Sequence, residues 1–175
     1  REEIARQLEE FAYHDALTGL PSLRLGLDCI AAAIAEARRK NLPYSVMFLD
    51  LDGFKAINDN HVHRYGDEVL NAVANRILEE VRETDTVARI GGDEFLVILA
   101  RIRGRDVVSR IAANLVECIG VPIDVDGYQL QVTASVGIAL YPEHGKDADS
   151  LIKCAEQAMY IVKREGENEF RFAGT

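Results

Sequence analysis

The stretch that decides the fold of this chain is Arg89-Ile90-Gly91-Gly92-Asp93-Glu94-Phe95. Apolar, strand-like runs flank it at Thr86–Ile90 and Phe95–Leu99, and a Gly-Gly pair between such runs predicts a β-hairpin. We expect positive φ angles at the two glycines, because tight hairpin turns demand them at their central residues. Asp93 and Glu94 place two carboxylates at the tip, where like charges repel unless a cation or a proton intervenes. This pattern indicates a turn that holds a metal.

The apolar periodicity on either side of this hairpin predicts an α+β fold. The core order is strand, helix, strand, strand, helix, strand, which is the β-α-β-β-α-β pattern of the ferredoxin-like or palm-type class, with a mostly antiparallel central sheet flanked by helices. The expected helices span residues 2–13, 22–40, 66–81, 106–119 and 147–164, and the expected strands span 44–52, 86–90, 95–99, 121–124, 128–131, 132–140 and 170–172.

This topology predicts where acidic residues meet. A right-handed crossover makes the first two core strands parallel and leaves a gap that the third strand fills in the antiparallel sense. Asp50, near the end of the first strand, should therefore lie beside Asp93 and Glu94 at the start of the third. Such a cluster suits Mg²⁺ and a two-metal site for phosphoryl transfer. Taken singly, Asp50 also fits a helix cap and Asp93 a turn residue, so the metal hypothesis depends on the convergence.

The residues after the first strand offer partners for a nucleotide. Backbone N–H groups of Gly53 and Phe54, with the Lys55 ammonium, could cradle phosphates, although neither a GxxxxGK[ST] nor a GxGxxG motif is present. Asn58 and Asp67 supply an amide donor and a carboxylate acceptor, a pairing suited to guanine. Each also fits a structural role, Asn58 in a turn and Asp67 in the first turn of a helix.

Composition narrows the class of protein. The 175 residues fit one domain, with 48% hydrophobic and 28% charged residues, and no apolar run is long enough to span a bilayer. A net charge of −9 argues against binding to nucleic acid or an anionic membrane. Three widely spaced cysteines, Cys29, Cys118 and Cys154, predict free thiols and a cytoplasmic location. A structural metal site has little support, because His14, His61 and His63 lack ligand spacing with these cysteines.

The motifs taken together resemble the GGDEF domain, the catalytic domain of diguanylate cyclases, which condense two GTP into cyclic di-GMP and release two pyrophosphates. The resemblance covers residues 12 to about 168. Its segments are DALTGLP (15–21), FLDLDGFKAIND (48–59), YGDEVL (65–70), RIGGDEF (89–95), SVGIALYP (135–142) and AEQAMYIVK (155–163).

The resemblance implies a role for each matching residue. Asp50 and Asp93, with the Leu51 carbonyl, would hold two Mg²⁺ or Mn²⁺ ions per active site. Glu94 would bind the second ion or take the proton from the attacking ribose 3′-hydroxyl, whereas the family does not usually give Asp52 a metal role. The implied GTP-binding residues are Gly53, Phe54, Lys55, Asn58, Asp67, Gly91, Gly92 and Lys163. The implied catalytic residues are Glu94, Asp93 and Lys55. Arg82 and Asp85 form an RxxD, the position of a product-inhibition site that binds cyclic di-GMP.

The same resemblance implies partners and an arrangement of domains. Residues 1–13 would be a linker helix, part of a coiled coil controlled by an upstream sensor, and residues 14–175 the catalytic domain. Because each domain holds one GTP, catalysis requires a second copy facing it. The chain begins at Arg1 rather than Met, so we expect a piece of a longer protein.

Four positions depart from the family pattern: Ser22, Leu23, Val62 and Glu167. An acid at 167 would repel GTP unless it points to solvent, and valine at 62 tolerates positive φ poorly. The alternative hypothesis is therefore a catalytically weak or inactive module that binds GTP or cyclic di-GMP and regulates an attached signalling domain.

Overall fold

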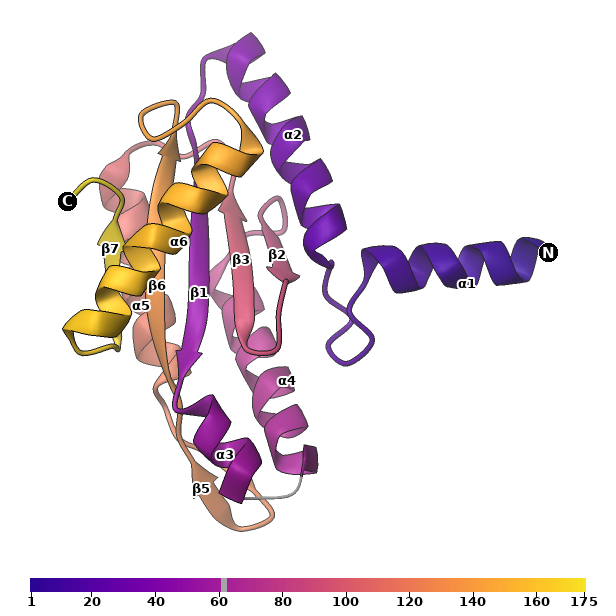
Figure 1. Ribbon diagram of the computed structural model, residues 1–175. Coiled ribbons are helices and arrows are strands. Elements are labelled where there is room, and N and C mark those ends of the chain that lie inside the picture. The colour runs from indigo at the N-terminus through magenta and orange to yellow at the C-terminus, as the bar shows by residue number, and fades with distance from the viewer. Residues whose placement is uncertain (61–62) are drawn as a thin grey trace.

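The computed structural model describes residues 1–60 and 63–175, so the expectations for His61 and Val62 lie outside the described residues. Helices pack on both faces of a mixed, mostly antiparallel sheet (Figure 1). The helices are α1 (Glu2–Tyr13), α2 (Leu23–Lys40), α3 (Phe54–Asn60), α4 (His63–Glu80), α5 (Arg105–Ile119) and α6 (Ala148–Glu165). The strands are β1 (Tyr44–Asp52), β2 (Thr86–Arg89), β3 (Glu94–Leu99), β4 (Ile123–Val125), β5 (Tyr128–Leu130), β6 (Thr133–Tyr141) and β7 (Glu169–Phe172).

The sheet has the order β2-β3-β1-β6-β7, and β4 and β5 form a separate hairpin. β3 lies between β2 and β1 and is antiparallel to both, while β6 is antiparallel to β1 and β7 is parallel to β6. The predicted β-α-β-β-α-β core is therefore confirmed, with the third core strand filling the gap between the first two.

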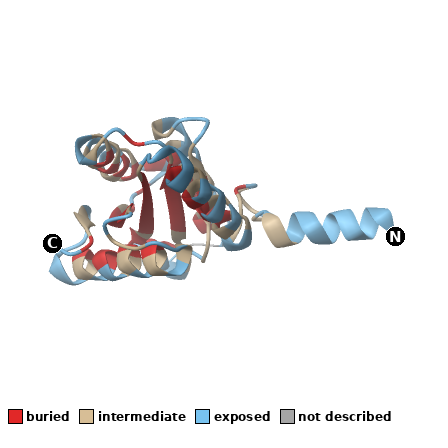
Figure 2. Ribbon diagram, turned by 90° about the horizontal axis from the view of Figure 1, so that it is seen from above, coloured by how far each residue is buried: buried red, intermediate tan, exposed pale blue. Residues whose placement is uncertain are grey.

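β1 is central because both of its faces are apolar, as its sequence predicted. Successive strand residues point to opposite faces: Leu49 and Leu51 join the core covered by α4 and α5, whereas Val46 and Phe48 join the core beneath α2 and α6. Figure 2 shows the buried sheet lying between helices that are exposed on their outer sides. Each such fully buried side chain contributes roughly 1.5–3 kcal/mol of transfer free energy.

Helix α1 confirms the helix expected over residues 2–13 but buries none of its residues. It projects away from the rest of the domain (Figures 1 and 2). Ile4, Leu8 and Phe11, which recur at helical spacing, are 62%, 65% and 78% exposed. The apolar stripe of α1 thus faces solvent along its whole length. No helix among the described residues combines the length and apolar character that crossing a membrane requires.

The structure corrects several local predictions. Residues 54–60 form the short helix α3, so Asn58 is a helix residue rather than a turn residue. Helix α4 begins at His63 instead of Gly66, which places Asp67 beyond its first turn. Helix α2 begins at Leu23 rather than at Ser22, and the Ser22 hydroxyl donates to the Ala12 carbonyl at 2.7 Å instead of capping the helix.

Candidate active site

The end of β1 and the start of β3 bring the predicted acidic residues to one edge of the sheet. Asp50 is the register partner of Glu94. The backbone N–H of the next residue, Leu51, donates to the Asp93 carbonyl at 3.1 Å. The expected convergence of Asp50 with Asp93 and Glu94 is therefore present, and the strand pairing produces it.

The carboxylates of this cluster have raised pKa values, because they are partly buried close to one another. Burial, together with repulsion from Asp93 and Glu94, raises the pKa of Asp50 from its ordinary value of 3.8 to about 6, against the attraction of Lys163. Burial and the charges of Asp93 and Glu156 likewise raise the pKa of Glu94. A cation placed among these groups would relieve both effects.

The donor set fits a divalent metal. Carboxylate and carbonyl oxygens, here from Asp50, Asp93 and Leu51, are the ligands that Mg²⁺ and Mn²⁺ prefer. Within residues 1–60 and 63–175, no three acidic, histidine or cysteine side chains are placed to hold an ion on their own. Mg²⁺ ordinarily takes one or two carboxylates and completes its shell with water and substrate phosphates. The residues therefore suit a metal that arrives with a nucleotide.

Asp52 has the opposite environment to Asp50, although both lie on the same face of β1. Its carboxylate accepts hydrogen bonds from the Thr133 and Ser135 hydroxyls, both at 2.7 Å, and from the Asn168 N–H at 3.1 Å. The Lys163 ammonium, 2.6 Å away, completes the set. Burial alone would raise the pKa of Asp52, but these hydrogen bonds outweigh it and lower the pKa. This partnered site went unpredicted, because its members come from three distant segments.

Lys163 reaches over the strand end from α6. Beyond Asp52, its ammonium lies 3.4 Å from the Leu51 carbonyl and 3.5 Å from the Asp50 carboxylate. Burial lowers the pKa of Lys163, but the hydrogen bond to Asp52 and the charges of both aspartates reverse the effect and raise it. In this structure the Lys163 ammonium is paired with two carboxylates, so the phosphate contact expected of Lys163 would be made by a cation that already has partners.

The turn between β2 and β3 corrects the predicted role of its glycines. Neither Gly91 nor Gly92 has a positive φ angle. A Cβ atom at Gly91 would instead stand 2.4 Å from Glu94 Oε1, whereas one at Gly92 would meet nothing within 4 Å. A larger residue at 91 would therefore displace the Glu94 carboxylate, so glycine here leaves room for the Glu94 side chain and does not serve a positive φ angle.

An ion pair ties this turn to the segment that follows α1. Arg89 donates to the Gly92 carbonyl through Nε at 3.2 Å and Nη2 at 2.9 Å, and its Nη1 lies 2.9 Å from Asp15 Oδ1. The other Asp15 oxygen accepts from the Thr18 N–H and hydroxyl. Sequence reasoning missed this link, whose two charged residues lie in separate motifs.

Gly53, Phe54 and Lys55 lead from β1 into α3. Gly53 takes a φ of +81°, which glycine adopts without strain. The Phe54 side chain is buried in the core, so Phe54 can meet a ligand only through its main chain, whereas Lys55 is exposed. Half-buried Asn58, on α3, lies against Gly66 of α4, and the next residue, Asp67, is exposed. The two residues expected to read guanine are thus brought to neighbouring positions.

The family model described as "Diguanylate cyclase, GGDEF domain" matches residues 12–169. The chain belongs to this family. It is 41% identical, over 95% of its length, to the bifunctional diguanylate cyclase/cyclic di-GMP phosphodiesterase MucR of Pseudomonas aeruginosa, and 40% identical, over 93%, to the diguanylate cyclase TpbB of the same organism. It spans 24% and 38% of these two proteins.

Solved GGDEF domains share the fold. A structure of only the GGDEF domain of TpbB matches with a TM-score of 0.89 at 40% identity, covering 91% of this chain and 94% of that one. The coiled coil and GGDEF domain of DgcB from Caulobacter crescentus, solved in complex with cyclic di-GMP, matches with a TM-score of 0.86 at 28% identity, covering 98% of this chain and 91% of that one.

In the RxxD of this GGDEF domain, Arg82 and Asp85 form an ion pair with each other, which we call the closed pair. The Arg82 guanidinium donates to both Asp85 carboxylate oxygens, at 3.0 and 3.1 Å, and also to the Ala100 carbonyl. Asp85 further accepts from the backbone N–H groups of Arg82 and Ala100, and its side chain is 0% exposed, against 52% for Arg82. Asp85 therefore joins the start of β2 to the end of β3, and Arg82 is the exposed member of the pair.

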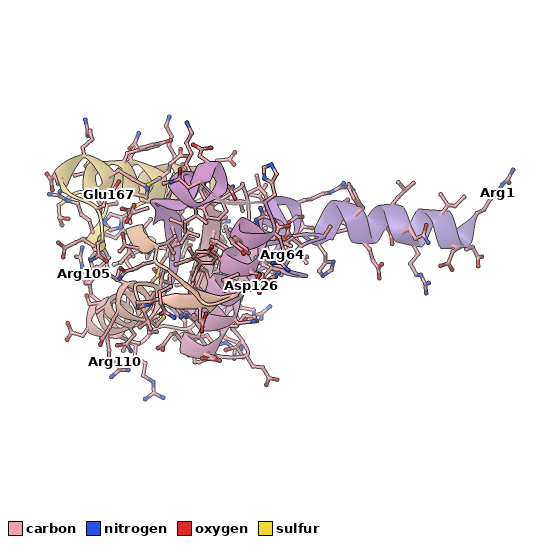
Figure 3. The ribbon with its side chains drawn as sticks, turned by 90° about the horizontal axis from the view of Figure 1, so that it is seen from below. Arg1, Arg64, Arg105, Arg110, Asp126 and Glu167 are labelled. Atoms are coloured by element: carbon pink, nitrogen blue, oxygen red, sulfur yellow. The ribbon has the colours of Figure 1, made fainter. Side chains whose placement is uncertain are left out.

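Three of the departing positions lie among the described residues. Leu23 is exposed at the start of α2, and the Ser22 hydroxyl bonds to the end of α1 as described above. Glu167 is exposed in the turn between α6 and β7, at a φ of +66° (Figure 3). The residue is exposed, yet its negative charge contributes to the raised pKa of Lys163, so the charge is felt at the strand end.

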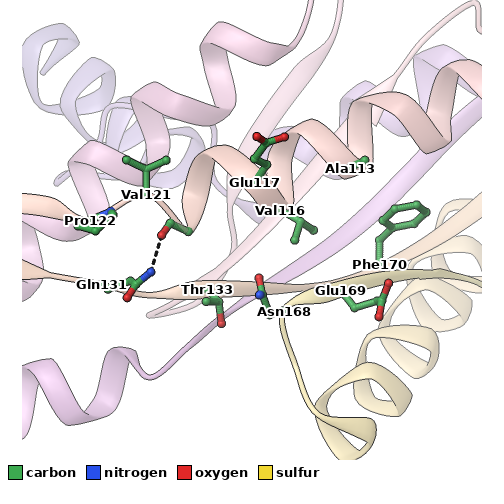
Figure 4. A pocket seen from close by; sticks show the side chains of 11 residues that line it. Ala113, Val116, Glu117, Val121, Pro122, Gln131, Thr133, Asn168, Glu169 and Phe170 are labelled. Carbon is green, nitrogen blue, oxygen red and sulfur yellow. Dashed lines mark hydrogen bonds between the residues drawn. The ribbon is translucent and has the colours of Figure 1, made fainter.

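A sizeable cavity of this GGDEF domain lies away from the acidic cluster. It has a volume of about 550 Å³ and opens between α5 and the strands β6 and β7. Val116, Val121 and Phe170 supply apolar walls, and Thr133 and Asn168 line it beside Asp52 (Figure 4). None of Asp50, Asp93 and Glu94 lines it, so this cavity is separate from the acidic cluster.

Proposed function

We propose that this GGDEF domain is a diguanylate cyclase that condenses two GTP into cyclic di-GMP and two pyrophosphates. The observation that carries the proposal is the meeting of Asp50, Asp93 and Glu94 at one sheet edge, where burial and mutual repulsion raise the pKa values of Asp50 and Glu94. Diguanylate cyclases among the relatives support the reaction class.

The groups around the cluster have distinct tasks in this reaction. Asp50, Asp93 and the Leu51 carbonyl would hold Mg²⁺ or Mn²⁺, which when bound neutralises the charge that develops on the phosphates. Lys55, exposed at the start of α3, would bind the triphosphate. Glu94, whose raised pKa makes its carboxylate a better base, would accept the 3′-hydroxyl proton. The ribose oxygen then forms a bond to the α-phosphorus of the other GTP, and the bond from that phosphorus to pyrophosphate breaks.

The reaction requires two domains, because each 3′-hydroxyl attacks the nucleotide held by the other copy. The exposed apolar stripe of α1 is suited to pairing two copies in a coiled coil. The match to the coiled coil and GGDEF domain of DgcB, which covers 98% of this chain, supports that role. Residues 1–13 would then set how two catalytic domains face each other under an upstream sensor.

A second candidate function is a regulatory module that binds GTP or cyclic di-GMP without turnover. Glu167 favours it, since an acid there adds negative charge near the candidate triphosphate site. Relatives named as cyclic di-GMP phosphodiesterases, NbdA of P. aeruginosa and PdeR of Escherichia coli, are 38% and 37% identical to this chain. The closed Arg82–Asp85 pair is compatible with either function, provided that cyclic di-GMP opens it.

The decisive experiment incubates the domain with GTP and Mg²⁺ or Mn²⁺ over a range of protein concentrations and separates the products by chromatography. We expect cyclic di-GMP and pyrophosphate, with a rate per domain that rises with concentration. Asp93→Ala should lower the rate more than about a hundredfold. Asp106→Asn, an equal loss of charge at the exposed start of α5, should not. GTP binding without product would favour the regulatory module, and a concentration-independent rate would overturn the two-domain mechanism.

A further inference from the structure

Gly66 is a buried residue inside a helix whose backbone does not require glycine. It is the fourth residue of α4, and its φ angle is not positive. Glycine weakens a helix relative to alanine, so its presence needs another cause. A Cβ atom at this position would stand 1.9 Å from Asn58 Oδ1 and 3.0 Å from Asn58 Cγ. The missing side chain is the space that the Asn58 amide occupies.

The other glycine inside a long helix has a milder environment. A Cβ atom at Gly26, in α2, would lie 3.3 Å from the Cβ of Ala88, so the neighbours need to yield by only a few tenths of an ångström. At Gly66 the conflict is far larger, but the two nearest atoms belong to the end of the rotatable Asn58 side chain, and the Phe54 ring, at 3.3 Å, is no closer than Ala88 is at Gly26. A methyl group added at 66 should therefore turn the Asn58 amide away and leave the fold intact.

The position of Asn58 is otherwise determined by α3. Phe54 and Ile57, on the same short helix, are only 6% and 7% exposed, so the core holds the α3 backbone in place. The Asn58 amide oxygen is the atom nearest to Gly66, and its NH₂ group, which is farther from Gly66, is the hydrogen-bond donor of the side chain. The residue after Gly66 is Asp67, an exposed acceptor on the adjacent helix.

These contacts suit one base. Guanine presents O6 and N7 as acceptors and N1–H and the 2-amino group as donors, so an amide NH₂ and a carboxylate side by side can satisfy both edges. Adenine presents an amino group where guanine has O6 and would face a donor with a donor. We propose that Gly66 is a positioning residue for guanine, because it holds the Asn58 amide beside Asp67. The inference rests on the proposed function and assigns to Gly66 a share of its base specificity.

The test measures equilibrium binding of 3′-deoxy-GTP, which lacks the attacking hydroxyl and cannot react, and of 3′-deoxy-ATP. Gly66→Ala should weaken 3′-deoxy-GTP binding about tenfold, the effect of losing one hydrogen bond in a polar site, and should change weak 3′-deoxy-ATP binding little. In turnover assays the KM for GTP should rise while kcat changes little. Gly26→Ala, the matched helix control, should leave both nucleotides unaffected.

A double-mutant cycle separates this role from a general packing effect. In an Asn58→Ala background the amide is gone and the Phe54 ring, 3.3 Å from the added Cβ, is the close neighbour that remains, so Gly66→Ala should then change 3′-deoxy-GTP binding less than twofold. An equal loss of binding in both backgrounds, or unchanged binding by a folded Gly66→Ala variant, would overturn the proposal. If the wild-type domain binds no 3′-deoxy-GTP, the proposed function itself fails, and the two failures are thereby distinguished.

Discussion

Asp50 and Asp52 lie two residues apart on one face of β1, yet their surroundings shift their pKa values in opposite directions. Asp52 accepts hydrogen bonds from two hydroxyls, a backbone N–H and an ammonium, and its pKa is lowered. Asp50 faces two other carboxylates, with one ammonium at 3.5 Å, and its pKa is raised to about 6. The surroundings of Asp52 stabilise the fold, whereas those of Asp50 leave a negative charge that a cationic ligand can neutralise.

The difference teaches how to separate structural acids from functional ones at a single strand end. A buried carboxylate with enough donors holds distant segments together. A partly buried carboxylate surrounded by like charges lowers stability and is retained where a site needs it. Substitutions that only remove the charge should therefore have opposite signs at these two positions.

The largest expected effect is at Asp52. Asp52→Asn keeps the shape but removes the charge that binds Lys163, and we expect a loss of about 3 kcal/mol in unfolding free energy at pH 7, as for a broken buried pair. Because the folded-state pKa of Asp52 lies below 3.8, its contribution is present above that pH and is lost as the pH falls through the folded-state value. Urea unfolding of both proteins from pH 7 to pH 3 measures this loss, and an unchanged midpoint would show that Asp52 is not a structural acid.

Asp50→Asn should shift stability in the other direction. Its folded-state pKa of about 6 lies above the ordinary 3.8, so the ionised group destabilises the fold above pH 6 and the penalty disappears as the pH falls below 3.8. Two pH units correspond to about 3 kcal/mol, a net value that already includes the attraction of Lys163, and we expect a gain of about 1–3 kcal/mol at pH 8. Urea unfolding in EDTA measures the gain, which should vanish near pH 4, while turnover of GTP is lost. Destabilisation at pH 8 would contradict the contrast with Asp52.

Asp85 extends the comparison, because it is a third carboxylate and, like Asp52, has several hydrogen-bond donors. Substitution of its exposed partner Arg82 should change stability least. Arg82→Ala removes a side chain that is 52% exposed, so we expect a change in stability below about 1 kcal/mol. Inhibition by cyclic di-GMP should weaken about tenfold or more, because a charged hydrogen-bond donor is lost. Arg103→Ala, an exposed arginine further along the chain, is the control. Initial-rate assays with added cyclic di-GMP decide it, and an unaltered inhibition curve would place the inhibitory site elsewhere.

The fold and the acidic cluster could be predicted because their causes are local or topological. The apolar runs of β1 and β3 and the glycine-rich turn between β2 and β3 determine the strands, and the handedness of the crossover then places Asp50 beside Glu94. Helix α3 could not be predicted in this way, because seven residues with two buried positions carry too little periodicity. The reason for Gly91 also differed from expectation, since glycine there leaves room for the Glu94 side chain and has no positive φ angle.

The sequence by itself therefore determined the family, the order of the strands and the meeting of Asp50, Asp93 and Glu94. Only the tertiary structure decided which acids have partners: Lys163 is 111 residues from Asp52, and Asn58 finds its place against Gly66 across a helix boundary. The physical reason is that the hydrophobic pattern is a property of the sequence itself, whereas hydrogen bonds, desolvation and side-chain contacts depend on distances that exist only after folding.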